Sequence, residues 1–67
     1  MNSDQLKGQW KQALGAAKEK WGKLTADDWK QIEGNRDQLI GRIQERYGVA
    51  REEAQRQVEE WQRTHAA

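Results

Sequence analysis

Six glycines, all that this chain of 67 residues contains, fall in two groups of three with a seven-residue step inside each group. The first group is residues 8, 15 and 22, and the second is residues 34, 41 and 48, displaced by 26. A fixed displacement of this kind indicates an internal repeat. Each unit is predicted to be a long helix, a glycine stop and a second helix. Because there is no proline, nothing forbids long helices.

Apolar residues recur at helical spacing within both units. In the first unit they step by four, three and four, as a single buried stripe on a helix requires; they are Trp10, Leu14, Ala17 and Trp21. The second unit has one stripe before Gly48 and another on a last helix over about 51–64; these are Leu39, Ile40, Ile43 and Tyr47, then Ala54, Val58 and Trp61. Most of the core is therefore expected to come from the second unit and its tryptophan neighbours.

The predicted fold is all-α: a small bundle of four helices arranged as two repeated helical hairpins, in one domain over residues 1–67. A chain of this length buries only about 60% of its unfolded surface, so the core is expected to be marginal. Charged residues make up 34% of the chain and its mean hydropathy is −1.29, near the composition of disordered proteins. Four tryptophans shift the balance toward folding.

Capping signals mark a short helix over about 26–33. Thr25 followed by Asp28 spells a capping box, and Leu24 and Trp29 are placed as a hydrophobic staple around it.

Glycine and asparagine mark the remaining helix boundaries. Gly22 suits a left-handed residue ending the first helix, and Gly34 and Gly48 are expected to close the second and third. Asn35, with Gln38 three residues on, repeats the cap signal for the third helix.

The last helix lacks such a cap, because Ala50 stands where Ser or Thr would be natural. On that helix, Glu52 with Arg56 and Glu59 with Arg63 are predicted to pair at i,i+4.

The residues needed for catalysis or metal binding are scarce. There is no cysteine, and both His65 and Ser3 lie close to a chain end, so no nucleophile can be paired with a base. The adjacent acids are interpreted as water-facing helix residues; they are Asp27 with Asp28, Glu52 with Glu53 and Glu59 with Glu60. We therefore predict no enzyme, no catalytic or metal-ligating residue and no cofactor.

Positive charge is concentrated in the first unit. Residues 1–24 carry five lysines and two acids, a net of +3, against −2 for residues 25–67. Lys7, Lys11 and Lys18 fall within about 40° of one another on a helical wheel and flank the apolar stripe. The aliphatic parts of these three lysine side chains are interpreted as packing along the apolar stripe of the core. Weak binding of the lysines to an anionic surface is the alternative. The tryptophans are interpreted as core rather than as a base-stacking platform, so no specific nucleic acid is expected.

Neither a signal peptide nor a run of about 18 apolar residues is present, so the protein is expected to be cytoplasmic with no membrane span.

Glycines 8, 15 and 41 lie inside predicted helices, where each costs about 0.8 to 1 kcal/mol relative to alanine. They either admit a close neighbour or keep the helices soft. Softness is favoured at Gly15, and Gly41 is left open.

Three segments, residues 8–12, 18–28 and 33–48, resemble the CsbD-like family of bacterial stress proteins, and the run from Glu33 to Gly48 is the most specific. The resemblance covers nearly the whole chain. It implies a small hydrophilic cytoplasmic protein made in quantity under general stress or in stationary phase, with no catalytic or ligand residues to carry over.

Two functional hypotheses follow. The first is a general stress-response protein that acts as a hydrophilic protectant of proteins or membranes. The second is a helical interaction module that docks one specific protein partner through an amphipathic face.

Overall fold

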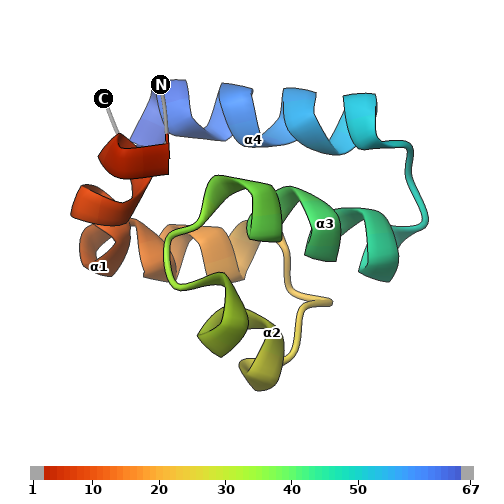
Figure 1. Ribbon diagram of the computed structural model, residues 1–67, viewed down its shortest axis with the longest axis horizontal. Helices are drawn as coiled ribbons and strands as arrows, with labels where there is room; N and C mark the ends of the chain where they lie inside the picture. Colours follow the sequence, from red (N-terminus) through yellow and green to blue (C-terminus); the bar gives the residue numbers. More distant parts are fainter. Residues whose placement is uncertain (1–2, 66–67) are drawn as a thin grey trace.

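The computed structural model describes residues 3–65, with the surroundings of the side chains given for residues 10–64. It contains four helices, α1 (Ser3–Lys20), α2 (Ala26–Ile32), α3 (Arg36–Tyr47) and α4 (Arg51–His65), and no strand in that range (Figure 1). The all-α prediction is therefore confirmed, and the helix bounds differ from the predicted ones by at most a residue or two after the first helix. The molecule extends 27 × 24 × 18 Å.

The central element is α3. Figure 1 shows α4 running along one side of α3 and α2 lying on the other, while α1 contacts both α3 and α4. Helices α3 and α4 form a hairpin through the short turn at residues 48–50. Helix α2 packs against α3 rather than alongside α1, so the arrangement as two repeated hairpins is not confirmed.

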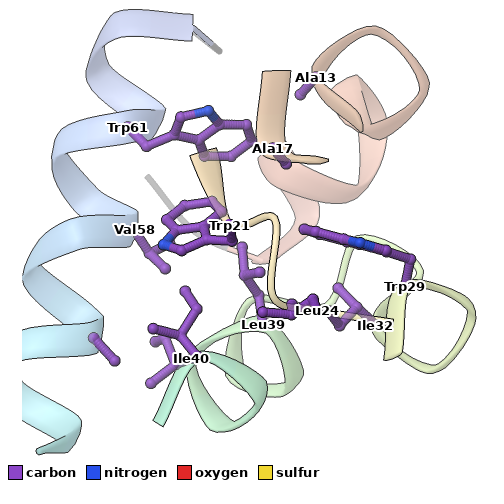
Figure 2. Close-up of a cluster of buried hydrophobic side chains, with 12 residues drawn as sticks. Ala13, Ala17, Trp21, Leu24, Trp29, Ile32, Leu39, Ile40, Val58 and Trp61 are labelled. Carbon is purple, nitrogen blue, oxygen red and sulfur yellow. The ribbon is translucent and has the colours of Figure 1, made fainter. Parts of the chain in front are cut away.

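The core draws on all four helices and on the turn after α1. Figure 2 shows Trp21 near the centre of the cluster, with Trp61 and Val58 on the α4 side and Trp29 at the opposite edge. The rings of Trp21 and Trp61 meet edge to face, with centroids 5.4 Å apart. The predicted stripes are confirmed as buried at eight positions: Ala17, Trp21, Leu39, Ile40, Ile43, Ala54, Val58 and Trp61. Three other stripe residues, Trp10, Leu14 and Tyr47, are partly buried against the core.

The start of α2 follows its capping box. The Thr25 hydroxyl accepts a hydrogen bond from the Asp28 backbone N–H at 3.1 Å, and the Thr25 backbone N–H donates to Asp28 Oδ2 at 2.9 Å. Leu24 and Trp29, the predicted staple residues, are both buried. The Asn35 side chain caps α3 by accepting from the Gln38 backbone N–H at 3.1 Å.

Two predicted helix ends need correction. The backbone of Gly22 is not in the left-handed region. Helix α1 is followed instead by a turn in which the Leu24 N–H donates to the Trp21 carbonyl at 3.2 Å. Helix α2 is capped by the left-handed Glu33, with φ 40°, one position before the predicted Gly34, which follows it with φ 80°. Only at Gly48, with φ 65°, does the predicted glycine itself end its helix.

The interior glycines of α1 and α3 face open space. A Cβ added at Gly15 or Gly41 would meet nothing within 4 Å. The interpretation that these two glycines admit a close neighbour within the fold is therefore wrong, and the soft-helix interpretation is the one that fits. Gly8 lies outside the residues whose surroundings are described.

The two predicted ion pairs of α4 are replaced by others. Arg56 contacts Glu53 at 2.6 Å and Glu60 at 3.2 Å, instead of Glu52. Glu59 contacts Arg36 of α3 at 3.0 Å, instead of Arg63. Packing of α3 beside α4 brings Arg36 within reach of Glu59, a contact that spacing along α4 could not indicate.

Candidate functional site

An ion pair between the buried Asp28 carboxylate and the solvent-exposed Arg46 joins α2 to α3. The Asp28 carboxylate accepts from Arg46 Nε at 2.8 Å and from Arg46 Nη2 at 3.1 Å, while Arg42 Nε lies 3.9 Å from Asp28 Oδ1. With the Thr25 N–H also donating to it, the carboxylate accepts three hydrogen bonds. We call Asp28, Arg46 and Thr25 the α2–α3 clamp.

The clamp corrects the interpretation of Asp28 as a water-facing residue. Asp28 is 3% exposed, whereas its neighbour Asp27 is exposed as predicted. The sequence indicates the capping role of Asp28 but not its arginine partner. Arg42 and Arg46 are four residues apart on one face of α3, and that spacing was the available signal. Which helix covers that face is decided only by tertiary packing.

The clamp holds Asp28 in its charged form. Hydrogen bonds from Arg46, and then from the Thr25 backbone, lower the pKa of Asp28 from 3.8 to about 2, against the opposing effect of burial. A general acid or base needs a pKa near the working pH. Asp28 is therefore suited to holding helices together rather than to moving protons.

A second polar network ties the turn after α1 to α4. Trp21 Nε1 donates to Gln57 Oε1 at 3.1 Å, and Gln57 Nε2 donates to Glu53 Oε2 at 2.9 Å. The hydrogen bonds from Arg56 and then Gln57 lower the pKa of Glu53. Trp21 is thus held both by its ring contact with Trp61 and by its N–H, which orients the central side chain of the core.

The other acids singled out in the sequence do not converge. Glu52 is exposed beside an open hollow of about 250 Å³ whose other lining residues are Gln55, Arg56 and Glu59. Two of these side chains are already engaged in ion pairs. Over the described residues, no three His, Cys, Asp or Glu side chains lie where they could hold a metal ion. The side chains of His65 and Ser3 lie outside the described residues.

The lysines of the first unit that lie within residues 10–64 are on the surface. Lys11 and Lys18 are exposed on α1, and the side chain of Lys7 lies outside the described residues. Lys20 Nζ lies 5.7 Å from the Trp21 ring centroid, and Lys23 Nζ lies 5.2 Å from that of Tyr47. These two contacts are cation–π contacts of later lysines, and the predicted packing of the Lys7, Lys11 and Lys18 stems along the apolar stripe stays a prediction.

The tryptophans serve the core. Trp21, Trp29 and Trp61 are 1%, 7% and 2% exposed, and Trp10 is partly buried with its ring centroid 6.0 Å from that of Trp29. The interpretation of the tryptophans as core residues is confirmed for the first three.

The family model described as CsbD-like matches residues 4–56. The chain belongs to the CsbD-like family. Its α2–α3 clamp lies inside the matched segment, whereas Trp61, the α4 partner of Trp21, lies beyond it.

Curated bacterial proteins are similar to this CsbD-like chain over nearly its whole length. It is 60% identical to UPF0337 protein ECA0631 of Pectobacterium atrosepticum over 65 residues, which is 97% of this chain and 94% of that protein. It is 55% identical to UPF0337 protein YjbJ of Escherichia coli K12 over 62 residues, with 92% and 90% covered. It is 45% identical to UPF0337 protein pc0632 of Protochlamydia amoebophila over 65 residues, which is 97% of this chain and 98% of that protein.

No solved structure matches the CsbD-like chain significantly. Over the residues described, none of its helices is both long and apolar enough to cross a membrane.

Proposed function

We propose that this protein serves the general stress response as a hydrophilic protectant that acts in bulk on its clients. Membership of the CsbD-like family supports the stress role. The composition, with 34% charged residues, supports a strongly hydrated surface. A protein of this kind works through abundance rather than through one high-affinity site.

The observation that carries the proposal is the placement of the interior glycines. Gly15 and Gly41 each weaken a helix, yet a Cβ at either position would meet nothing within 4 Å. No packing contact in the fold explains the choice of glycine over alanine. Soft, solvated helix faces are what a protein that adapts to many different client surfaces requires.

The test is the dose dependence of protection. A soluble enzyme is freeze-dried with increasing amounts of this protein and its recovered activity is measured after rehydration. For a protectant, we expect recovery to keep rising until the mass of protein is comparable with that of the client. Recovery no better than with a folded protein of equal charge and size would contradict the proposal.

The interaction-module hypothesis makes a different forecast in stressed cells. A module saturates one partner at one-to-one stoichiometry and should recover that partner in a pull-down at low expression. A single stoichiometric partner, combined with no protection of the client enzyme, would favour the module.

A further inference from the structure

The lysines and arginines of this protein are used differently. Five arginines form ion pairs with acids of the same chain; these are Arg36, Arg42, Arg46, Arg51 and Arg56. Within residues 10–64, by contrast, no lysine lies in an ion pair with an acid. Charge on α3 and α4 is thus largely neutralised internally, while the positive charge of α1 is left for the solvent or for a partner.

The uncompensated charge has a definite place on α1. Lys11 and Lys18 are seven residues apart, which brings them within about 20° of each other around the helix. Leu14 lies between them and Trp10 lies one turn before it, and both are only partly buried. The acid Glu19 projects roughly 100° away from Lys18. We call Lys11, Lys18, Leu14 and Trp10 the α1 lysine face.

We propose that the α1 lysine face binds the surface of anionic lipid bilayers. Exposed lysines beside a half-buried tryptophan and leucine match the chemistry of a membrane interface, where charges meet headgroups and amphipathic rings lie at their level. The face lies along the membrane surface, with the folded bundle above it. This inference goes beyond the proposed function and does not depend on it, because it stands on the charge distribution.

Two observations favour lipid over nucleic acid as the anionic partner. Bidentate recognition of nucleic-acid phosphates and bases uses arginine, and five arginines are already paired within the chain. Base stacking along a nucleic-acid strand uses several open aromatic rings, but three of the four tryptophans are buried and only Trp10 is partly exposed. Point charges and an apolar edge remain, and these suit a lipid surface.

The experiment is vesicle co-sedimentation of the full chain at 0.05 M and 0.3 M salt. Vesicles are pure phosphatidylcholine or contain one third phosphatidylglycerol. We expect binding to the anionic vesicles alone, weakening at least tenfold at the higher salt because salt screens the exposed lysine charges that carry it. Binding to both vesicle types alike, or to neither at low salt, overturns the proposal.

Matched charge reversals locate the surface. The variant Lys11→Glu/Lys18→Glu and the control Lys30→Glu/Arg63→Glu each change two exposed, unpaired cations, and each lowers the net charge by four, from +1 to −3. We expect at least a tenfold loss of affinity in the first and less than about threefold in the control. Equal losses would assign binding to net charge and overturn the α1 lysine face.

Two further arms complete the test. The neutral variant Lys11→Gln/Lys18→Gln, checked by circular dichroism, must also lose affinity, which separates loss of attraction from misfolding or repulsion.

A duplex DNA of 20 base pairs bound more tightly than the vesicles at equal salt would overturn the choice of lipid. Both lysine variants should still protect the lipid-free client enzyme, so failure here is distinguishable from failure of the protectant proposal.

Discussion

At the scale of single residues, one carboxylate determines how α2 is held. Asp28 serves two structural purposes at once, because it completes the capping box with Thr25 and accepts both hydrogen bonds from Arg46. A charge that is 3% exposed is tolerated only when it is paired and hydrogen-bonded. Removing either partner leaves the other without its contact, so the pair is expected to behave as a unit.

We predict that Asp28→Asn lowers the free energy of unfolding far more than Asp27→Asn does. Asparagine keeps the shape of Asp28 but loses the charge that holds Arg46, whereas Asp27 is exposed. Urea unfolding of the two variants measures the difference. Similar midpoints for both would mean that the α2–α3 clamp does not contribute to stability.

The clamp also predicts a specific dependence on pH. The pKa of Asp28 is about 2 in the folded protein and 3.8 as its ordinary value, so the folded state binds this proton less tightly than the unfolded state. The stabilisation is therefore complete above about pH 4 and declines as the pH falls toward 2. The difference in unfolding free energy between wild type and Asp28→Asn should be constant from pH 7 to about 4.5 and shrink below it. A difference that persists unchanged at pH 2 would contradict the lowered pKa.

At the scale of elements, the helix ends and interior glycines set how firmly each helix forms. Helix α4 begins at Arg51, and the Ala54 N–H donates to the Ala50 carbonyl at 3.0 Å, which places Ala50 at the cap position. Helix α3 ends at Gly48 with φ 65°, a conformation that a Cβ disfavours. Gly15 and Gly41 have neither a positive φ nor a close neighbour.

Ala50→Ser is expected to stabilise the protein by about 0.5 to 1 kcal/mol, because a serine hydroxyl can accept from a free N–H in the first turn. The expected stabilisation lies in the lower part of the usual range for an N-cap residue because Glu53, which would complete a capping box, is held by Arg56 and Gln57. The matched control is Ala26→Ser, inside the first turn of α2, which should not stabilise. Thermal unfolding followed by circular dichroism compares them.

Gly15→Ala and Gly41→Ala should each stabilise by about 0.4 to 1 kcal/mol, through helix propensity and a less flexible unfolded chain. Gly48→Ala is the contrasting variant and should destabilise by about 1 kcal/mol, since its φ is positive. Urea midpoints at unchanged m-value measure all three. A lower midpoint for Gly15→Ala would show that its open face is covered in solution.

At the scale of the whole molecule, a small core must hold four helices together. A chain of this size has a total stability of roughly 3 to 10 kcal/mol. Each fully buried side chain of α3 is therefore a large fraction of the total. Because α3 contacts every other helix, loss of its packing is expected to unfold the molecule as one unit.

We predict that Ile43→Ala, at a position with 0% exposure, destabilises the protein by about 2 to 5 kcal/mol and lowers the cooperative melting transition as a whole. Leu14→Ala, at a partly buried position on α1, is the control and should cost clearly less. Tryptophan fluorescence and circular dichroism should report the same midpoint in each variant. Separate midpoints would indicate that α2 or α1 unfolds independently of the α3–α4 hairpin.

The sequence by itself determined the local features of this protein. Helical spacing of apolar residues, the Thr25 and Asn35 caps and the stop at Gly48 all depend on residues within a few positions of one another, so they could be predicted. The run from Glu33 to Gly48 also sufficed to indicate the CsbD-like family.

Tertiary structure alone decided the contacts between distant segments. Packing of α2 on α3 brought Arg46 to Asp28 across 18 positions, and packing of α4 on α3 brought Glu59 to Arg36 across 23. Those contacts turned an apparently solvated acid into a buried one and placed α2 against α3. The physical reason is that periodicity fixes which face of a helix is buried, whereas the helix that covers this face is chosen by the packing of the whole chain.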